Sequence, residues 1–141
     1  MHEKIGDANA MAFGAYRRAQ LPDTYTHSNA VRMTMRAIAP ILEVVALLHD
    51  VVEDTDVTLD DIRCEFGDTV ANAVDALTRR EGESYHREYL PRVKTNPFAW
   101  IVKAVGDVPH NKARPRAPGW SEKRLASMQR RYDRALEELR F

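Results

Sequence analysis

Residues 44–55 read VVALLHDVVEDT, and this stretch decides the fold. It begins as an apolar run and ends in four ionisable side chains, His49, Asp50, Glu53 and Asp54. At helical spacing, residues four apart lie on the same face, so all four project over one sector at the end of the helix. Such a cluster is costly in an apolar environment unless a cation pairs with it. A divalent metal ion is the obvious partner for imidazole and carboxylate donors.

The segments around this stretch also read as helices. Apolar residues recur at helical spacing before it and after it, and no hairpin signal or internal repeat interrupts them. Thr58, Asn96 and Ser121 stand where helix N-caps are expected, and Pro109 is expected to end or kink a helix. The predicted helices are 8–20, 28–39, 41–52, 59–66, one capped by Asp68 or Thr69 and reaching Leu77, 84–94, 98–107 and 122–139. The sequence therefore predicts an all-α helical bundle with a cleft between its helices.

Composition points to one ordinary globular domain spanning residues 1–141. Of the 141 residues, 44% are hydrophobic and 30% charged, and no apolar run is long enough to span a membrane. The N-terminus lacks a signal peptide pattern, and a single cysteine fits a reducing cytoplasm. The net charge of zero gives no reason to expect nucleic acid or a membrane surface as partner, and a homo-oligomer stays open.

Charge is unevenly distributed along the chain. Residues 43–68 contain nine acidic residues and one basic residue, whereas residues 95–141 contain ten basic and five acidic residues. This asymmetry is typical of a solvated face, and it also suits a site with a metal end and an anion-binding end.

Two further residues complete a candidate set of metal ligands. His27 lies near the start of the preceding predicted helix, and Asp107 ends another apolar helix. With His49 and Asp50 they give two imidazoles and two carboxylates, a mixed set that suits Mn²⁺, Fe²⁺, Zn²⁺ or Mg²⁺. Glu53 and Asp54 would lie just outside this set and could orient a water, take its proton or protonate a leaving oxygen.

Several segments resemble the HD-domain hydrolases of the RelA/SpoT homologues, and in particular the small stand-alone alarmone hydrolases. Residues 46–55 closely resemble the signature of that family, and residues 58–62, 66–67 and 70–78 continue the likeness. Residues 25–27 resemble its Tyr-x-x-His-Pro element with one residue missing, and 107–111 its Asp-x-x-His-Asn element. Residues 119–124 resemble a late segment of the family, so the likeness covers about residues 8–140.

The resemblance implies an all-α HD fold that binds one Mn²⁺, or another divalent metal. It implies attack of metal-bound water on guanosine tetra- or pentaphosphate, the nucleotides of the stringent response, with release of the 3′-pyrophosphate. By motif position, the ligands would be His27, His49, Asp50 and Asp107. Glu53 and Asp54 would serve the attacking water and the leaving group. Asn111 would contact the nucleotide, and Arg124 could hold phosphate.

The sequence departs from the family around Asp107 and before His27. The family usually has Lys-Leu-Ala before this aspartate and Arg-Leu after it, whereas residues 104–106 here are Ala-Val-Gly and residues 108–109 are Val-Pro. We therefore expect a basic residue to be lost on each side of Asp107. Arg17 and Arg18 are candidates to replace the altered basic element before His27.

These departures leave two alternatives. The first is the same metal chemistry on another nucleotide, such as an adenosine alarmone or a nucleoside monophosphate. The second is an antitoxin or nucleotide-binding module that keeps the fold without turnover.

Overall fold

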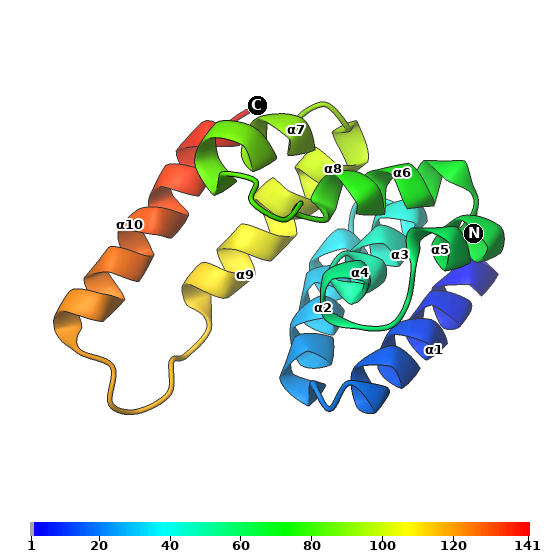
Figure 1. Cartoon of the computed structure of the whole chain (residues 1–141), viewed down its shortest axis with the longest axis horizontal. Coiled ribbons are helices and arrows are strands. Elements are labelled where there is room, and N and C mark those ends of the chain that lie inside the picture. Colours follow the sequence, from blue (N-terminus) through cyan, green and yellow to red (C-terminus); the bar gives the residue numbers. More distant parts are fainter. Residues whose placement is uncertain (1) are drawn as a thin grey trace.

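The computed structural model describes residues 2–141, and every regular element in this range is helical (Figure 1). The elements in chain order are α1 (His2–Arg18), α2 (Pro22–Met35), α3 (Pro40–Leu48), α4 (Val51–Asp54), α5 (Leu59–Phe66), α6 (Asp68–Leu77), η1 (Tyr85–Tyr89), α7 (Leu90–Val93), α8 (Pro97–Ile101), η2 (Val102–Asp107), α9 (Val108–Ala113) and α10 (Glu122–Glu138). No helix in this range is long and apolar enough to cross a membrane.

The most apolar helix, α3, lies at the centre of the molecule. Residues 42–48 are buried without exception, and α1, α2, α6, α8 and η2 pack around them. Burial of so continuous an apolar run is the main favourable term in folding. It also fixes the end of α3, and with it His49, deep among its neighbours.

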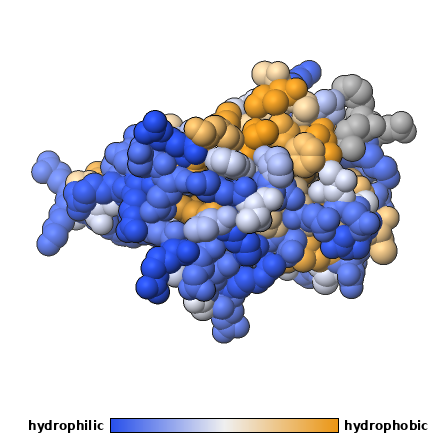
Figure 2. All heavy atoms as spheres, turned by 90° about the horizontal axis from the view of Figure 1, so that it is seen from above, coloured by the Kyte–Doolittle hydropathy of each residue, from blue (hydrophilic) through white to orange (hydrophobic). Residues whose placement is uncertain are grey.

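Helices α9 and α10 lie side by side and form an arm, joined at its tip by the loop 114–121 (Figure 1). The C-terminal end of α10 is anchored by the indole of Trp100, whose N–H donates to the carbonyl of Leu139 at 2.6 Å and whose ring stacks on Phe141. The arm end of the molecule is mainly hydrophilic, while apolar surface gathers over the opposite half (Figure 2).

Three predicted caps are confirmed. The side chains of Thr58, Asn96 and Ser121 each accept a hydrogen bond from a backbone N–H in the first turn of α5, α8 and α10, respectively. The predicted cap at residue 68 or 69 is wrong, because Gly67 takes the N-cap position at φ +88°. The second helix also begins earlier than predicted, at Pro22, because proline is well suited to a first helical turn.

The central helix is interrupted where the sequence predicts continuity. Helix α3 ends at Leu48, His49 and Asp50 form a turn, and α4 resumes at Val51. Asp50 has φ −109° and ψ −3°, away from ideal helical values. The simple face shared by residues four apart is therefore lost at the point where the ionisable side chains begin.

Pro109 does not end its helix, and the helix is not divided at this residue. The chain remains helical from Pro97 to Ala113, but residues 102–107 form a π-helix, in which the N–H of Val108 donates to the carbonyl of Lys103 five residues back. A second π-helix, η1, occupies residues 85–89. Short π segments of this kind occur often at functional sites.

Candidate metal centre

Four side chains from three parts of the chain meet beneath the arm. His27 comes from α2, His49 and Asp50 from the turn after α3, and Asp107 from the end of η2. Nε2 of His27 lies 2.7 Å from Oδ1 of Asp107 and 4.0 Å from Oδ2 of Asp50. Ligand atoms of His27, His49 and Asp50 all lie within 4.8 Å of one another, which is close enough to share one ion.

The orientation of His49 leaves one ring nitrogen facing the carboxylates. Its Nδ1 lies 2.5 Å from the carbonyl oxygen of Ala46, which can only accept, so Nδ1 carries the proton. Its buried Nε2 lies 3.0 Å from Asp50 and 3.5 Å from Asp107, yet makes no aligned hydrogen bond with any described residue. In the neutral ring this nitrogen is a lone pair directed at two anions, an arrangement that calls for a cation.

The pKa values of the clustered side chains also indicate that a cation is needed here. Burial would lower the pKa of His49, but the carboxylates of Asp50 and Asp107 hold it well above the usual range. Burial would raise the pKa of Asp107, but Lys103 and the two histidines hold it well below the usual range. Without a metal ion, a proton on His49 must neutralise the carboxylates. The donor set of nitrogen and oxygen atoms therefore fits a divalent metal ion.

Lys103 is a residue of the site that the sequence reasoning missed. Its Nζ lies 2.7 Å from Oδ2 of Asp107, and its side chain is only 12% exposed. The expectation that no basic residue precedes Asp107 is therefore wrong, because the lysine lies one place further back in the sequence. Its position four residues before Asp107 was the available signal, since such residues meet on a helix.

Asn111 also contacts the cluster rather than projecting from it. Its side-chain amide donates to Oδ1 of Asp107 at 3.1 Å. His110, next to it, places Nδ1 2.6 Å from Nδ1 of His27, so one of these rings donates a hydrogen bond to the other. Both ring nitrogens of His27 are thus engaged, one toward Asp107 and one toward His110.

Glu53 and Asp54 lie at the exposed edge of the cluster. Partial burial and the charge of Asp50 raise the pKa of both carboxyl groups. Oε1 of Glu53 accepts a hydrogen bond from the backbone N–H of Arg79 at 2.5 Å, which ties α4 to the loop after α6. Carboxyl groups whose pKa is raised in this way suit proton transfer near neutral pH.

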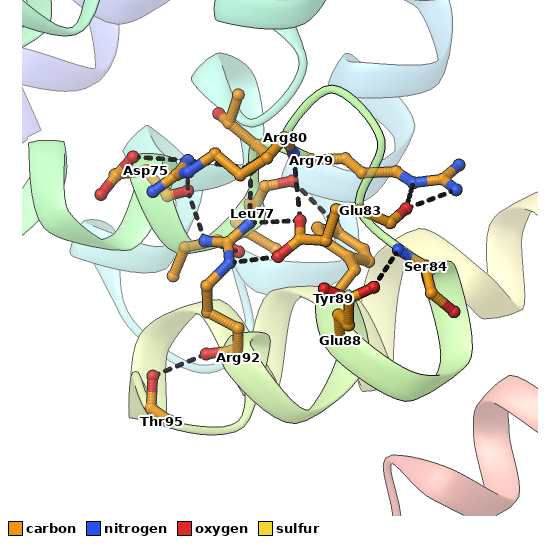
Figure 3. Close-up of polar contacts among 12 residues, drawn as sticks. Asp75, Leu77, Arg79, Arg80, Glu83, Ser84, Glu88, Tyr89, Arg92 and Thr95 are labelled. Atoms are coloured by element: carbon orange, nitrogen blue, oxygen red, sulfur yellow. Dashed lines mark hydrogen bonds and ion pairs between the residues drawn. The ribbon is translucent and has the colours of Figure 1, made fainter.

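The loop that holds Glu53 is itself fixed by a second network (Figure 3). The guanidinium of Arg92 makes two hydrogen bonds to the carboxylate of Glu83, at 2.8 and 2.9 Å. It also donates to the last carbonyl groups of α6, including that of Thr78 at 2.7 Å. The loop carrying Arg79 is therefore held between the end of α6 and α7.

A cleft of about 430 Å³ opens beside the cluster, between α2 and the loop of the arm. Its lining includes His27, His110, Arg114, Arg116 and Trp120. Arg124 does not line this cleft: its guanidinium group stacks on Trp120, 3.4 Å from the ring centroid, and lines a separate pocket that Trp120 also borders. Arginine and aromatic side chains together suit a phosphorylated ligand with a planar base.

Arg17 and Arg18 point to different places. Arg17 lines a separate, more apolar cavity of about 490 Å³ with Phe13 and Tyr25. Arg18 forms an ion pair with Asp56 on the surface, at 3.0 Å. Neither lines the cleft beside His27, although Thr26 borders both cavities.

Comparison with known proteins gives partial matches to a pyrophosphohydrolase and to a pyrophosphokinase. No family model matches the chain. It is 36% identical over 90 residues to the human guanosine-3′,5′-bis(diphosphate) 3′-pyrophosphohydrolase MESH1, covering 57% of this chain and 48% of that one. It is 39% identical over 77 residues to a probable GTP pyrophosphokinase of Mycobacterium leprae, covering 48% of this chain and 10% of that one. The chain thus spans half or less of the length of the curated relatives it matches.

A solved structure extends the likeness to nearly the whole chain. That structure is of a metazoan ortholog of SpoT that hydrolyses ppGpp. It matches with a TM-score of 0.81 at 22% identity and covers 97% of this chain and 85% of that one. The comparisons confirm the resemblance seen in the sequence, and the structural one confirms the all-α HD-domain fold.

Proposed function

We propose that this chain is a single-domain, metal-dependent hydrolase that removes the 3′-pyrophosphate from guanosine 3′,5′-bis(diphosphate) or a related alarmone. The observation that carries the proposal is the buried Nε2 of His49, which faces the carboxylates of Asp50 and Asp107 without an aligned hydrogen bond. The pyrophosphohydrolase activity of MESH1 and the hydrolysis of ppGpp by the metazoan SpoT ortholog support the choice of substrate. The single cysteine fits work in a reducing cytoplasm.

In this proposal, His27, His49, Asp50 and Asp107 hold the metal ion, for which we choose Mn²⁺. A divalent ion at such a site makes water a stronger nucleophile at neutral pH and neutralises charge on phosphate oxygens. Nitrogen and oxygen donors in equal number suit Mn²⁺, and Zn²⁺ and Fe²⁺ are the competitors to test beside it.

Glu53 and Asp54 handle the protons. Water oxygen adds to the phosphorus joined to the ribose 3′ oxygen, and the bond between that phosphorus and the 3′ oxygen breaks. One carboxylate takes the proton of the water, and the other, protonated, gives its proton to the 3′ oxygen. Their raised pKa values suit both tasks, and the hydrogen bond from Arg79 keeps Glu53 in place.

The substrate side of the proposal is the cleft beside His27. Arg114 would hold phosphate groups in this cleft and Trp120 would lie against the base, while Arg124 would reach a phosphate from the neighbouring pocket that Trp120 also borders. Asn111, whose side-chain amide donates to Asp107, would contact the nucleotide next to the cluster. Arg17 would reach the nucleotide from the neighbouring cavity, and Arg18 would do so only by giving up its ion pair with Asp56.

A second candidate keeps the metal centre and changes the nucleotide. Val108 and Pro109 stand where the resembling family has a basic residue and leucine, which removes one phosphate partner next to the metal ligand. A nucleoside monophosphate would need fewer such partners, whereas an adenosine alarmone would differ from the guanosine one in its base alone.

Product analysis with Mn²⁺ present separates these substrates. Pyrophosphate from the guanosine 3′-pyrophosphate substrate, at a rate well above that from its adenosine counterpart, supports the leading proposal. Orthophosphate from monophosphates supports the second candidate. A protein that binds these nucleotides but turns none of them over would be a binding module, and both proposals would fail.

A further inference from the structure

A lysine is enclosed on the inner side of the metal cluster. Nζ of Lys103 lies 2.7 Å from Oδ2 of Asp107, and it lies 5.6 and 5.0 Å from the ring centroids of Tyr85 and Tyr89. An ammonium group in such surroundings is costly unless its partner is well placed.

The π-helix η2 explains how this lysine reaches Asp107. Lys103 lies four residues before Asp107. The wider π turn holds one more residue than an α turn, as shown by the hydrogen bond from Val108 to Lys103 five residues back. Val105, 38% exposed, lies on the outer side of this turn. The extra residue therefore lies on the outside, and the lysine remains against the aspartate.

The second π-helix supplies the walls around the lysine. Tyr85 and Tyr89 come from η1, where the N–H of Tyr89 donates to the carbonyl of Ser84 five residues back at 2.8 Å. The hydroxyl of Tyr89 donates to the carbonyl of Leu77 at 2.5 Å, which fixes its ring against the end of α6. Two π segments thus meet at one buried ion pair.

The two oxygens of the Asp107 carboxylate face different groups. Its Oδ2 faces Lys103, while its Oδ1 faces His27, His49 and the amide of Asn111. A carboxylate held in this way can offer a metal ion only the oxygen that remains on the cluster side. Since Lys103 is enclosed by protein, it acts on the aspartate and not on a ligand in the cleft.

We infer that Lys103 is a positioning residue, which the π turn of η2 holds against Oδ2 of Asp107 so that this aspartate presents Oδ1 alone to the metal ion. The inference rests on the proposed metal centre. Removal of a hydrogen-bonding partner behind a metal ligand typically weakens metal binding about 10- to 100-fold. We expect a loss of that size in Lys103→Met.

Calorimetric titration of the metal-free protein with Mn²⁺ tests this directly. Lys103→Met should bind Mn²⁺ at least about tenfold more weakly than the wild type. The matched control is Lys94→Met, because Lys94 also lies over an aromatic ring, 5.2 Å from the centroid of Trp100, but has no contact with the cluster. Its affinity for Mn²⁺ should equal that of the wild type.

Thermal unfolding of the same metal-free variants separates positioning from a purely structural role. A lower Tm with unchanged Mn²⁺ affinity in Lys103→Met would overturn the inference. If that variant does not fold, Lys103→Ala, which also removes the donor, is titrated in its place, and wild-type affinity there would overturn it equally. If the wild type itself binds no Mn²⁺, the proposed metal centre fails, which is a different result.

Deletion of Val105 tests the role of the π turn. The deletion brings the lysine to three residues before the aspartate, a spacing at which an α turn still places the two side chains together, and should retain Mn²⁺ affinity within about threefold, since the second partner is kept. A folded deletion variant that binds Mn²⁺ as weakly as Lys103→Met would contradict the part of the inference that concerns register.

Discussion

At the scale of single residues, the centre depends on which atom of each side chain is already engaged. His49 uses Nδ1 on the carbonyl of Ala46, and Asp107 uses Oδ2 on Lys103, so Nε2 and Oδ1 remain for a shared cation. The sequence indicated the four residues of the cluster, His49 and Asp50 through the HD stretch, and His27 and Asp107 through their places near helix ends. It could not indicate which atoms would be free, because that depends on contacts with a carbonyl and a lysine that no motif encodes.

The two aspartates of the cluster should differ in their effect on stability. Asp107→Asn leaves Lys103 buried without its anionic partner, so the free energy of unfolding of the metal-free protein should fall by about 3–5 kcal/mol. Asp50 is 24% exposed and supports no buried lysine, so Asp50→Asn should cost less than about 1 kcal/mol. Urea unfolding in the presence of a chelator measures both. Equal losses would show that the ion pair of Lys103 contributes little.

At the scale of elements, the caps and apolar periodicities were sufficient to predict most helices. Thr58, Asn96 and Ser121 cap as predicted because side-chain capping depends on residues close in sequence. The break after Leu48 and the two π segments were not predicted. They depend on where α2, α3 and η2 must meet to form the cluster, and this tertiary requirement overrides local preference.

The close approach of η2 to α2 should make Gly106 hard to replace. A Cβ at this position would lie 2.7 Å from Cγ1 of Val31 and 3.1 Å from Cε of Met35. Gly106→Ala should therefore lower the free energy of unfolding by about 1–3 kcal/mol and disturb the pairing of His27 with Asp107.

The control for this substitution lies in α1. A Cβ at Gly6 meets nothing within 4 Å, so Gly6→Ala should be neutral or stabilise the helix by up to about 1 kcal/mol. Chemical unfolding measures both variants. A tolerated alanine at residue 106 would mean that the two helices can separate without cost.

The clamp on the loop after α6 should give a pH-dependent contribution to stability. Arg92 lowers the pKa of Glu83 to about 2, below the ordinary value of about 4.3 in the unfolded chain. Because the folded-state pKa is depressed, the stabilisation is fully present above about pH 5 and is lost as the pH falls toward 2.

Glu83→Gln makes that contribution measurable. The variant should be less stable than the wild type by about 1–2 kcal/mol at pH 7, and the difference should vanish as the pH approaches 2. Urea unfolding at pH 7, 5 and 3 measures this difference in the free energy of unfolding. A difference that stays constant over this range would rule out the ionised carboxylate as its source.

At the scale of the whole molecule, the arm lies beside α2 (Figure 1), and its loop lines the cleft next to the cluster with basic and aromatic residues. The acidic stretch 43–68 contributes Asp50 to the cluster, and the basic C-terminal stretch contributes Arg114 and Arg116 to the cleft. The fold class followed from the sequence. The different positions of Arg17, Arg18 and Arg124 did not follow from the sequence, because they depend on how short loops direct side chains that are equally basic.

The arm should affect substrate binding without affecting the metal. Arg124→Ala should raise KM for the nucleotide about tenfold while leaving Mn²⁺ affinity unchanged, because Arg124 contacts Trp120 and not the cluster. Arg134→Ala on the same helix is the matched control, since Arg134 pairs with Glu138 away from the cleft. Steady-state kinetics give KM for both variants, and titration with Mn²⁺ gives their affinity for the metal. An equal change in both variants would indicate a general effect on α10.

Pyrophosphate release from guanosine 3′,5′-bis(diphosphate) by metal-stripped protein, with and without added Mn²⁺ and beside Asp50→Ala, tests the central claim most directly. We predict release by the wild type only when Mn²⁺ is added, and none by Asp50→Ala at any Mn²⁺ concentration. Turnover that persists in Asp50→Ala, or in fully stripped wild-type protein, would contradict a metal centre built from His27, His49, Asp50 and Asp107.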